Sequence, residues 1–114
     1  ALIPASSGEK IDIVTTGERS EIRAVTPKPG TTISGWTWVA AVWGPQFAAH
    51  MHNESSSIAA SVLAEHHREA YVADILNHAI NAGLSAETVS FPDGRSFDLG
   101  TLEELNSYWA SGHR

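Results

Sequence analysis

A long stretch of helical periodicity limits what this chain can fold into more than any other feature of its sequence. Between about Ser57 and Ala82, apolar residues recur at intervals of three and four, so they share one face of a helix. The residues on this face are Ile58, Val62, Ala73, Leu76 and Ile80. Polar side chains occupy the opposite face, and Gly83 follows where helices commonly end in the left-handed conformation. The pattern predicts one long amphipathic helix whose apolar face packs on the rest of the chain.

The part of the chain before this helix has the two-residue alternation of β-strands. Residues 10–15 and 21–26 are rich in β-branched side chains, and the segment 16–20 between them contains a glycine, as a hairpin connection would. Residues 31–43 fit a period of two and a helical period alike. Their β-branched and aromatic content favours a strand, and both interpretations remain open for that segment.

A β-hairpin and a short helix are predicted after the long helix. An Asp-Gly dipeptide lies between the alternating segments 88–91 and 96–99, which is typical of a hairpin turn. Thr101 and Glu104 have the spacing of a capping box, which predicts the start of a final helix. The residues that we expect to be buried on this helix are Leu102, Leu105 and Trp109.

The order of these elements predicts an α+β protein of one domain. Its parts would be N-terminal antiparallel strands, one long amphipathic helix, a C-terminal β-hairpin and a short final helix. The 114 residues provide enough chain for one modest core. Within this domain we expect an extended arm at residues 1–8, a β-rich part at 9–47 and a helix-hairpin-helix part at 53–114.

Composition excludes several classes of function. Seven lysines and arginines oppose thirteen aspartates and glutamates, a formal net charge of −6, which argues against nucleic acid and anionic membranes as partners. The absence of cysteine excludes disulfides, zinc-thiolate sites and cysteine nucleophiles. The first residues lack the features of a secretory signal, and the apolar stretch 36–49 is too short to span a bilayer. We therefore expect a cytoplasmic product, which can be part of a larger particle.

Residues 75–110 resemble the head-to-tail joining proteins of the phage lambda W type. The residues that carry the resemblance are Glu-Thr-Val-Ser-Phe-Pro-Asp-Gly-Arg-Ser-Phe-Asp-Leu at 87–99 and Thr-Leu-Glu-Glu-Leu-Asn-Ser-Tyr-Trp at 101–109. In that family a helix, a hairpin with Asp-Gly-Arg at its tip and a second helix rich in Glu and Leu pack together. This chain departs from the family in its additional N-terminal part and in ending soon after the second helix.

The resemblance implies a structural protein of a phage-like particle, at the head–tail connector or elsewhere in the virion. Its partners would be other protein subunits, in a homo-oligomer or a ring. Its location would be the virion, or the cytoplasm before assembly.

A cluster of aromatic residues follows the first two strands. Three of the four tryptophans lie within eight residues, and such rings either form a core or act as anchors at a binding surface. Because so small a domain buries a limited fraction of its surface, we expect part of this cluster and the N-terminal arm to contact another chain. The candidate partner-binding residues are Trp36, Trp38, Trp43, Phe47, Leu2 and Ile3.

Two groups of residues offer alternatives in which the protein is an enzyme or binds a metal. His50, His52 and Glu54 are ligand types that suit zinc, iron or nickel, although they equally form a polar segment leading into a helix. His66 and Glu69 are three residues apart and are candidates for general acid–base catalysis. With no nucleophile motif or phosphate loop beside them, we favour a non-enzymatic protein without a cofactor. An accessory subunit or immunity-type inhibitor of a basic partner is a further alternative, since the chain is acidic.

Overall fold

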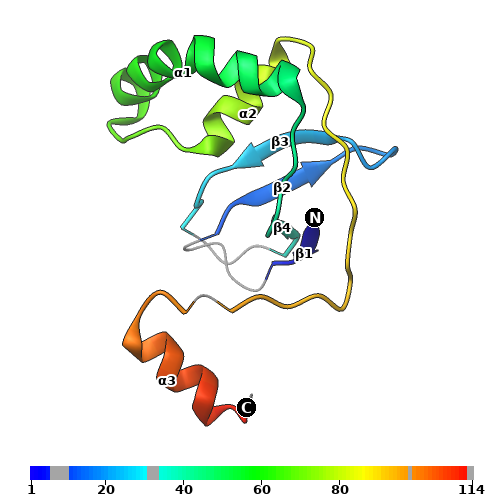
Figure 1. The fold of residues 1–114 in the computed structure, drawn as a ribbon, viewed down its shortest axis with the longest axis vertical. Helices are drawn as coiled ribbons and strands as arrows, with labels where there is room; N and C mark the ends of the chain where they lie inside the picture. The colour runs from blue at the N-terminus through cyan, green and yellow to red at the C-terminus, as the bar shows by residue number, and fades with distance from the viewer. Residues whose placement is uncertain (6–10, 31–33, 98, 113–114) are drawn as a thin grey trace.

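The computed structural model describes residues 1–5, 11–30, 34–97 and 99–112, and within them it contains one sheet and three helices (Figure 1). The strands are β1 (Leu2–Pro4), β2 (Ile13–Thr16), β3 (Ile22–Thr26) and β4 (Trp36–Trp38). The helices are α1 (Pro45–His66), α2 (Val72–Asn81) and α3 (Leu102–Ala110). The predicted α+β class is confirmed, and residues 36–38 of the segment left open form a strand. Residues 31–33 of that segment lie outside the described residues.

The sheet is antiparallel and has the strand order β1-β4-β2-β3. The pairs Leu2–Trp38, Val14–Trp36 and Val14–Val25 lie opposite each other across neighbouring strands, so their side chains share one face. Helix α2 covers this face and contributes the fully buried Ala73 to its core. The partly buried residues around the core are Ile22, Trp36, Trp38, Tyr71 and Leu76.

The segment after α2 runs along both edges of the sheet. Next to β3, the amide of Ile22 donates to the carbonyl of Ala86 at 2.8 Å. Next to β1, the amide of Leu2 donates to the carbonyl of Val89, and the amide of Phe91 donates to the carbonyl of Leu2, both at 2.8 Å. Figure 1 shows this segment in yellow and orange, running from α2 past β3 to β1. At these positions, the backbone groups of the edge strands are hydrogen-bonded within this chain and cannot pair with a strand of another chain.

The predicted long helix is two helices, which corrects the expectation of a single element from about Ser57 to Ala82. α1 begins earlier, at Pro45, where the fixed φ of proline suits the first helical position. It ends at His66, because His67 is in the left-handed conformation with φ 54° and donates its amide to the carbonyl of Leu63. Helix α2 then starts after Tyr71 and lies between α1 and the sheet (Figure 1).

The predicted C-terminal hairpin is not clearly shown. Its turn forms, with the amide of Gly94 donating to the carbonyl of Phe91 at 2.9 Å. The preceding segment, however, bonds to β1 and to the start of β3, whose edge groups offer it partners. The turn also lies against the sheet, since a Cβ atom at Gly94 would collide with the Ile3 side chain. Asp98, in the second predicted strand, is outside the described residues.

The final helix forms as predicted, but the predicted burial of its apolar residues does not occur. The Thr101 hydroxyl accepts from the amide of Glu104 at 3.1 Å, and the Glu104 carboxylate accepts from the amide of Thr101 at 2.9 Å, which completes the capping box. Leu102 is 73% exposed and Trp109 53% exposed, so the expectation of a buried stripe is wrong. Within the described part of the chain, α3 packs against no other helix or strand, and Figure 1 shows it apart from the sheet.

Candidate interaction surface

An apolar cleft of about 630 Å³ lies between α2 and the segment that joins β4 to α1. Its α2 wall is a stripe at helical spacing, and residues 84–88 continue that wall beyond the helix. The stripe residues are Val72, Leu76, Ala79 and Ile80. The facing wall consists of residues 40–47, and Trp38 lies at the base near the sheet. We call this feature the apolar cleft.

The wall opposite α2 is unusual because most of its apolar side chains are exposed. Pairing with β1 continues past β4 as far as Ala40, whose carbonyl accepts from the N-terminal amine at 2.7 Å. The chain then leaves the sheet until α1 begins at Pro45. In between, Val42 is fully exposed and Trp43 is 50% exposed, with its ring centroid 5.6 Å from that of Phe47. Exposed apolar side chains gathered in this way mark a surface that another group covers.

The three clustered tryptophans divide between core and surface. Trp36 and Trp38 pack against the core, and Trp38 also donates its indole N–H to the Asp12 carboxylate at 2.9 Å. Trp43 remains on the surface, next to the half-buried Phe47, so these two residues are the part of the aromatic cluster available to a partner.

The N-terminal arm is internal over its described part. Leu2 and Ile3 lie in β1 and are buried on the two faces of this chain's own sheet. Pairing with β4 places them there, which corrects the expectation that they contact a neighbouring subunit. Residues 6–8 of the predicted arm lie outside the described residues.

The metal candidates His50, His52 and Glu54 all lie on α1 and do not converge. Residues two apart on a helix point to different sides, so His52 is directed away from the other two. His50 instead meets His78 of α2, with 2.9 Å between its Nε2 and the Nδ1 of His78. Among the described residues, no three histidine or carboxylate side chains are placed to hold a metal ion. The geometry therefore contradicts the expectation that His50, His52 and Glu54 come together as ligands of one metal ion.

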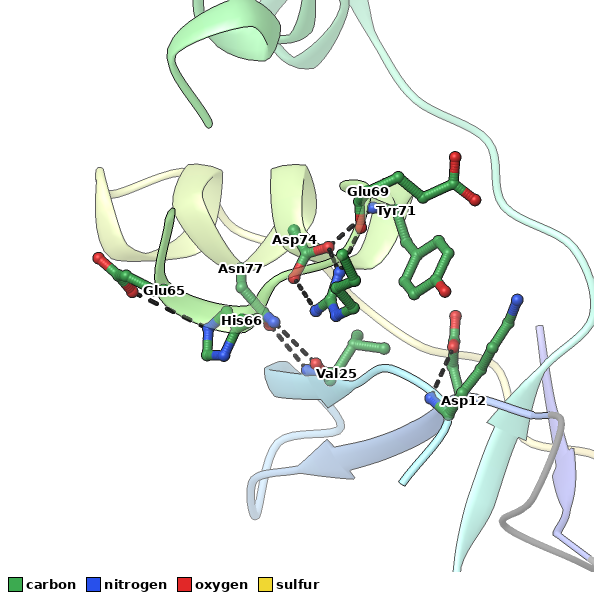
Figure 2. Close-up of polar contacts among 10 residues, drawn as sticks. Asp12, Val25, Glu65, His66, Glu69, Tyr71, Asp74 and Asn77 are labelled. Atoms are coloured by element: carbon green, nitrogen blue, oxygen red, sulfur yellow. Dashed lines mark hydrogen bonds and ion pairs between the residues drawn. The ribbon is translucent and has the colours of Figure 1, made fainter. Parts of the chain in front are cut away.

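The acid–base candidates His66 and Glu69 are also separated. His66 is the last residue of α1, and its Nε2 lies 3.9 Å from the Glu65 carboxylate. Figure 2 shows the Glu69 carboxylate directed away from His66. The end of α1 is what separates them, since both residues would share a helical turn only if the helix continued.

A polar network that the sequence analysis missed connects the two helices. Arg68 donates to both carboxylate oxygens of Asp74, at 2.8 and 2.9 Å, and the amide of Tyr71 donates to the same carboxylate at 2.7 Å (Figure 2). The hydrogen bonds from Arg68 hold the pKa of Asp74 below its ordinary value, against the effect of burial, and raise the pKa of Arg68. The Tyr71 ring lies beside two cations, Arg68 at 4.7 Å and Lys28 at 4.4 Å.

A second missed contact anchors α2 on the sheet. The Asn77 side chain accepts from the amide of Val25 at 2.8 Å and donates to the carbonyl of Val25 at 2.7 Å (Figure 2). It thus replaces a neighbouring strand at this point of β3. An asparagine on the sheet-facing side of a predicted helix is the signal that points to such a contact. Its partner, 52 positions earlier, has none.

Comparison with protein-family models, with curated protein sequences and with solved structures finds no match. None of the helices in the described ranges is long and apolar enough to cross a membrane.

Proposed function

We propose that this protein is a structural subunit of a larger assembly, in which copies of the chain pack against one another. The observation that carries the proposal is its surface. The chain exposes 8037 Å², whereas a compact monomer of this mass exposes about 6,100 Å². Its radius of gyration is 15.6 Å, against about 13 Å for a compact domain of this length.

The exposed surface is apolar at many positions. The large apolar side chains on it are Val39, Val42, Trp43, Leu63, Val72, Val89, Phe91, Phe97, Leu99, Leu102 and Trp109. Single exposed apolar residues are normal, but several of these are contiguous along the chain or share one helix face. Contact with further chains would remove this surface from water and stabilise the assembled form.

A phage-like particle, with the protein at its head–tail connector, is the assembly that we favour. The resemblance of residues 75–110 to W-type joining proteins supports this placement. The Asp-Gly turn and the Thr101–Glu104 capping box both form within the resembling segment. The location would then be the virion, or the cytoplasm before assembly.

Sedimentation velocity of the purified protein from micromolar to near-millimolar concentration tests the proposal. We expect species of several chains whose fraction grows with concentration, and rings when these species are viewed by electron microscopy. A mass of one chain at every concentration would contradict the proposal. Oligomers that are only dimers would contradict the connector placement, because a connector subunit packs around a ring.

A further inference from the structure

Helix α3 has an apolar face that the described chain covers only in part, since Leu102 and Trp109 are exposed while Leu105 is half-buried. Leu102, Leu105 and Trp109 share this face, while Glu104 lies on the other side and is held by Thr101. α3 has nine residues, and helices of this length are marginal in water unless an apolar face packs against something. Phe97, in the linker before the helix, meets Tyr108 at 4.9 Å between ring centroids. We therefore expect Leu102, Leu105 and Trp109 to pack against a further surface that stabilises α3.

The apolar cleft is a surface of that kind, and it lies in another part of the molecule. The α2 stripe and Trp43 contribute apolar walls, and its volume of about 630 Å³ is within the range of clefts that bury a drug-sized ligand, which leaves room for a few large side chains. Figure 1 shows α2 above the sheet and α3 below it. Helix-in-groove docking is a common way for an amphipathic helix to bind, and its anchors are spaced as Leu102, Leu105 and Trp109 are.

We propose that α3 of one copy docks in the apolar cleft of a neighbouring copy. This inference rests on the proposed function and names the contact by which the subunits associate. Because the donor helix and the acceptor cleft are different surfaces, the contact is head-to-tail. Repeated from copy to copy, a contact of this type closes into a ring or continues as a filament.

The area that the chain exposes agrees with one such contact per subunit. Its surface exceeds that of a compact monomer of the same mass by about 1,900 Å². A stable protein interface buries about 1,600 Å² in total over both partners. In a ring each chain gives one helix and one cleft, so each chain buries the equivalent of one complete interface. The acidic residues Glu103 and Glu104 would remain in water.

Cross-linking tests the contact directly, because the natural chain has no cysteine. Asn106→Cys places a thiol beside the apolar face of α3, and Ser85→Cys places one at the cleft. The two variants are mixed and treated with a short bis-maleimide. We expect the mixed product, identified by its linked peptides, to exceed both homodimers. Ser107→Cys, on the opposite side of α3, is the matched control and should cross-link weakly to Ser85→Cys.

The same experiment separates docking between chains from docking within one chain. If a chain carrying both cysteines cross-links internally while the mixture of single variants does not, α3 fills its own cleft and the proposal is overturned. Equal yields from Asn106→Cys and the Ser107→Cys control would also overturn it, because the helix face would then have no preferred side.

A second measurement distinguishes failure of this contact from failure of the proposed function. Trp109→Glu should weaken association in sedimentation by roughly thirtyfold, as loss of an aromatic anchor at an interface does. Ser107→Glu, on the opposite side of α3, should leave association unchanged. Oligomers that persist equally in Trp109→Glu would overturn the α3–cleft contact and leave the proposed function standing. A wild-type protein that is monomeric throughout would contradict both.

Discussion

Asp74 is the residue whose contacts set where α2 starts. Its carboxylate accepts from the Arg68 guanidinium and from the amide of Tyr71, and its side chain is only 12% exposed. An ion pair on an open surface contributes little to folding stability, but a bidentate and partly buried pair contributes more. The lowered pKa of Asp74 means that the folded state favours the ionised carboxylate.

Replacement of Asp74 should make the protein less stable and less sensitive to acid. At neutral pH, Asp74→Asn should lower the free energy of unfolding by about 2 kcal/mol, since a charged hydrogen-bonded partner of Arg68 is lost. Because the pKa of Asp74 is lowered on folding, its contribution is present above the ordinary value of 3.8 and is lost as pH falls below it. Urea unfolding at a series of pH values measures this.

The wild-type and Asp74→Asn curves should therefore converge as the pH is lowered toward the folded-state pKa of Asp74. Asp93→Asn, in an exposed turn, is the matched control and should follow the wild type. A constant difference between wild type and Asp74→Asn across the acid range would show that the carboxylate's charge does not contribute.

At the level of elements, the break between α1 and α2 depends on contacts rather than on local sequence. Residues 67–71 contain no glycine or proline, so nothing in their composition marks the end of a helix. The Arg68–Asp74 pair holds the linker against the first turn of α2, and the Asn77–Val25 contact holds α2 on the sheet, so both favour the break. Periodicity alone cannot detect this, since the apolar residues of both helices follow one continuous helical spacing in the sequence.

Glycine at position 67 should distinguish two helices from one. His67 is exposed and left-handed, a conformation that costs most side chains about 1–2 kcal/mol and costs glycine nothing. His67→Gly should therefore raise the free energy of unfolding by up to about 1 kcal/mol. Ala60→Gly, at an exposed position within α1, should instead lower it by about 1 kcal/mol. Thermal or urea unfolding in which both glycines destabilise equally would indicate a continuous helix.

Elements defined by neighbouring residues could be predicted from the sequence, and those defined by distant contacts could not. The capping box at Thr101 and the strand at 22–26 depend on residues a few positions apart, and both form. The pairing of residues 86–91 with Ile22 and Leu2, and the meeting of His50 with His78, join segments far apart in the chain. The candidate metal group at His50 failed for a different, local reason, because α1 begins before it and a helix directs His52 away from His50 and Glu54.

At the scale of the whole molecule, the fold closes its sheet edges but leaves its side-chain surfaces open. Residues 86–91 and Asn77 hydrogen-bond to backbone groups at both edges, so association by strand addition has no ready template at these positions. The apolar cleft and α3 remain exposed in different parts of the molecule. This distribution of surface favours association through side chains, and it accounts for a monomer more extended than its length requires.

Hydrogen exchange of α3, followed by mass spectrometry over a range of protein concentrations, tests the central claim most directly. An isolated nine-residue helix exchanges its amides almost freely, whereas a docked helix is protected. We predict that protection of α3 and of residues 40–47 rises together as the protein associates, and that Trp109→Glu moves both increases to roughly thirtyfold higher protein concentration. Protection of α3 that is the same at every concentration would contradict the account, because the helix would then be stabilised without a second copy.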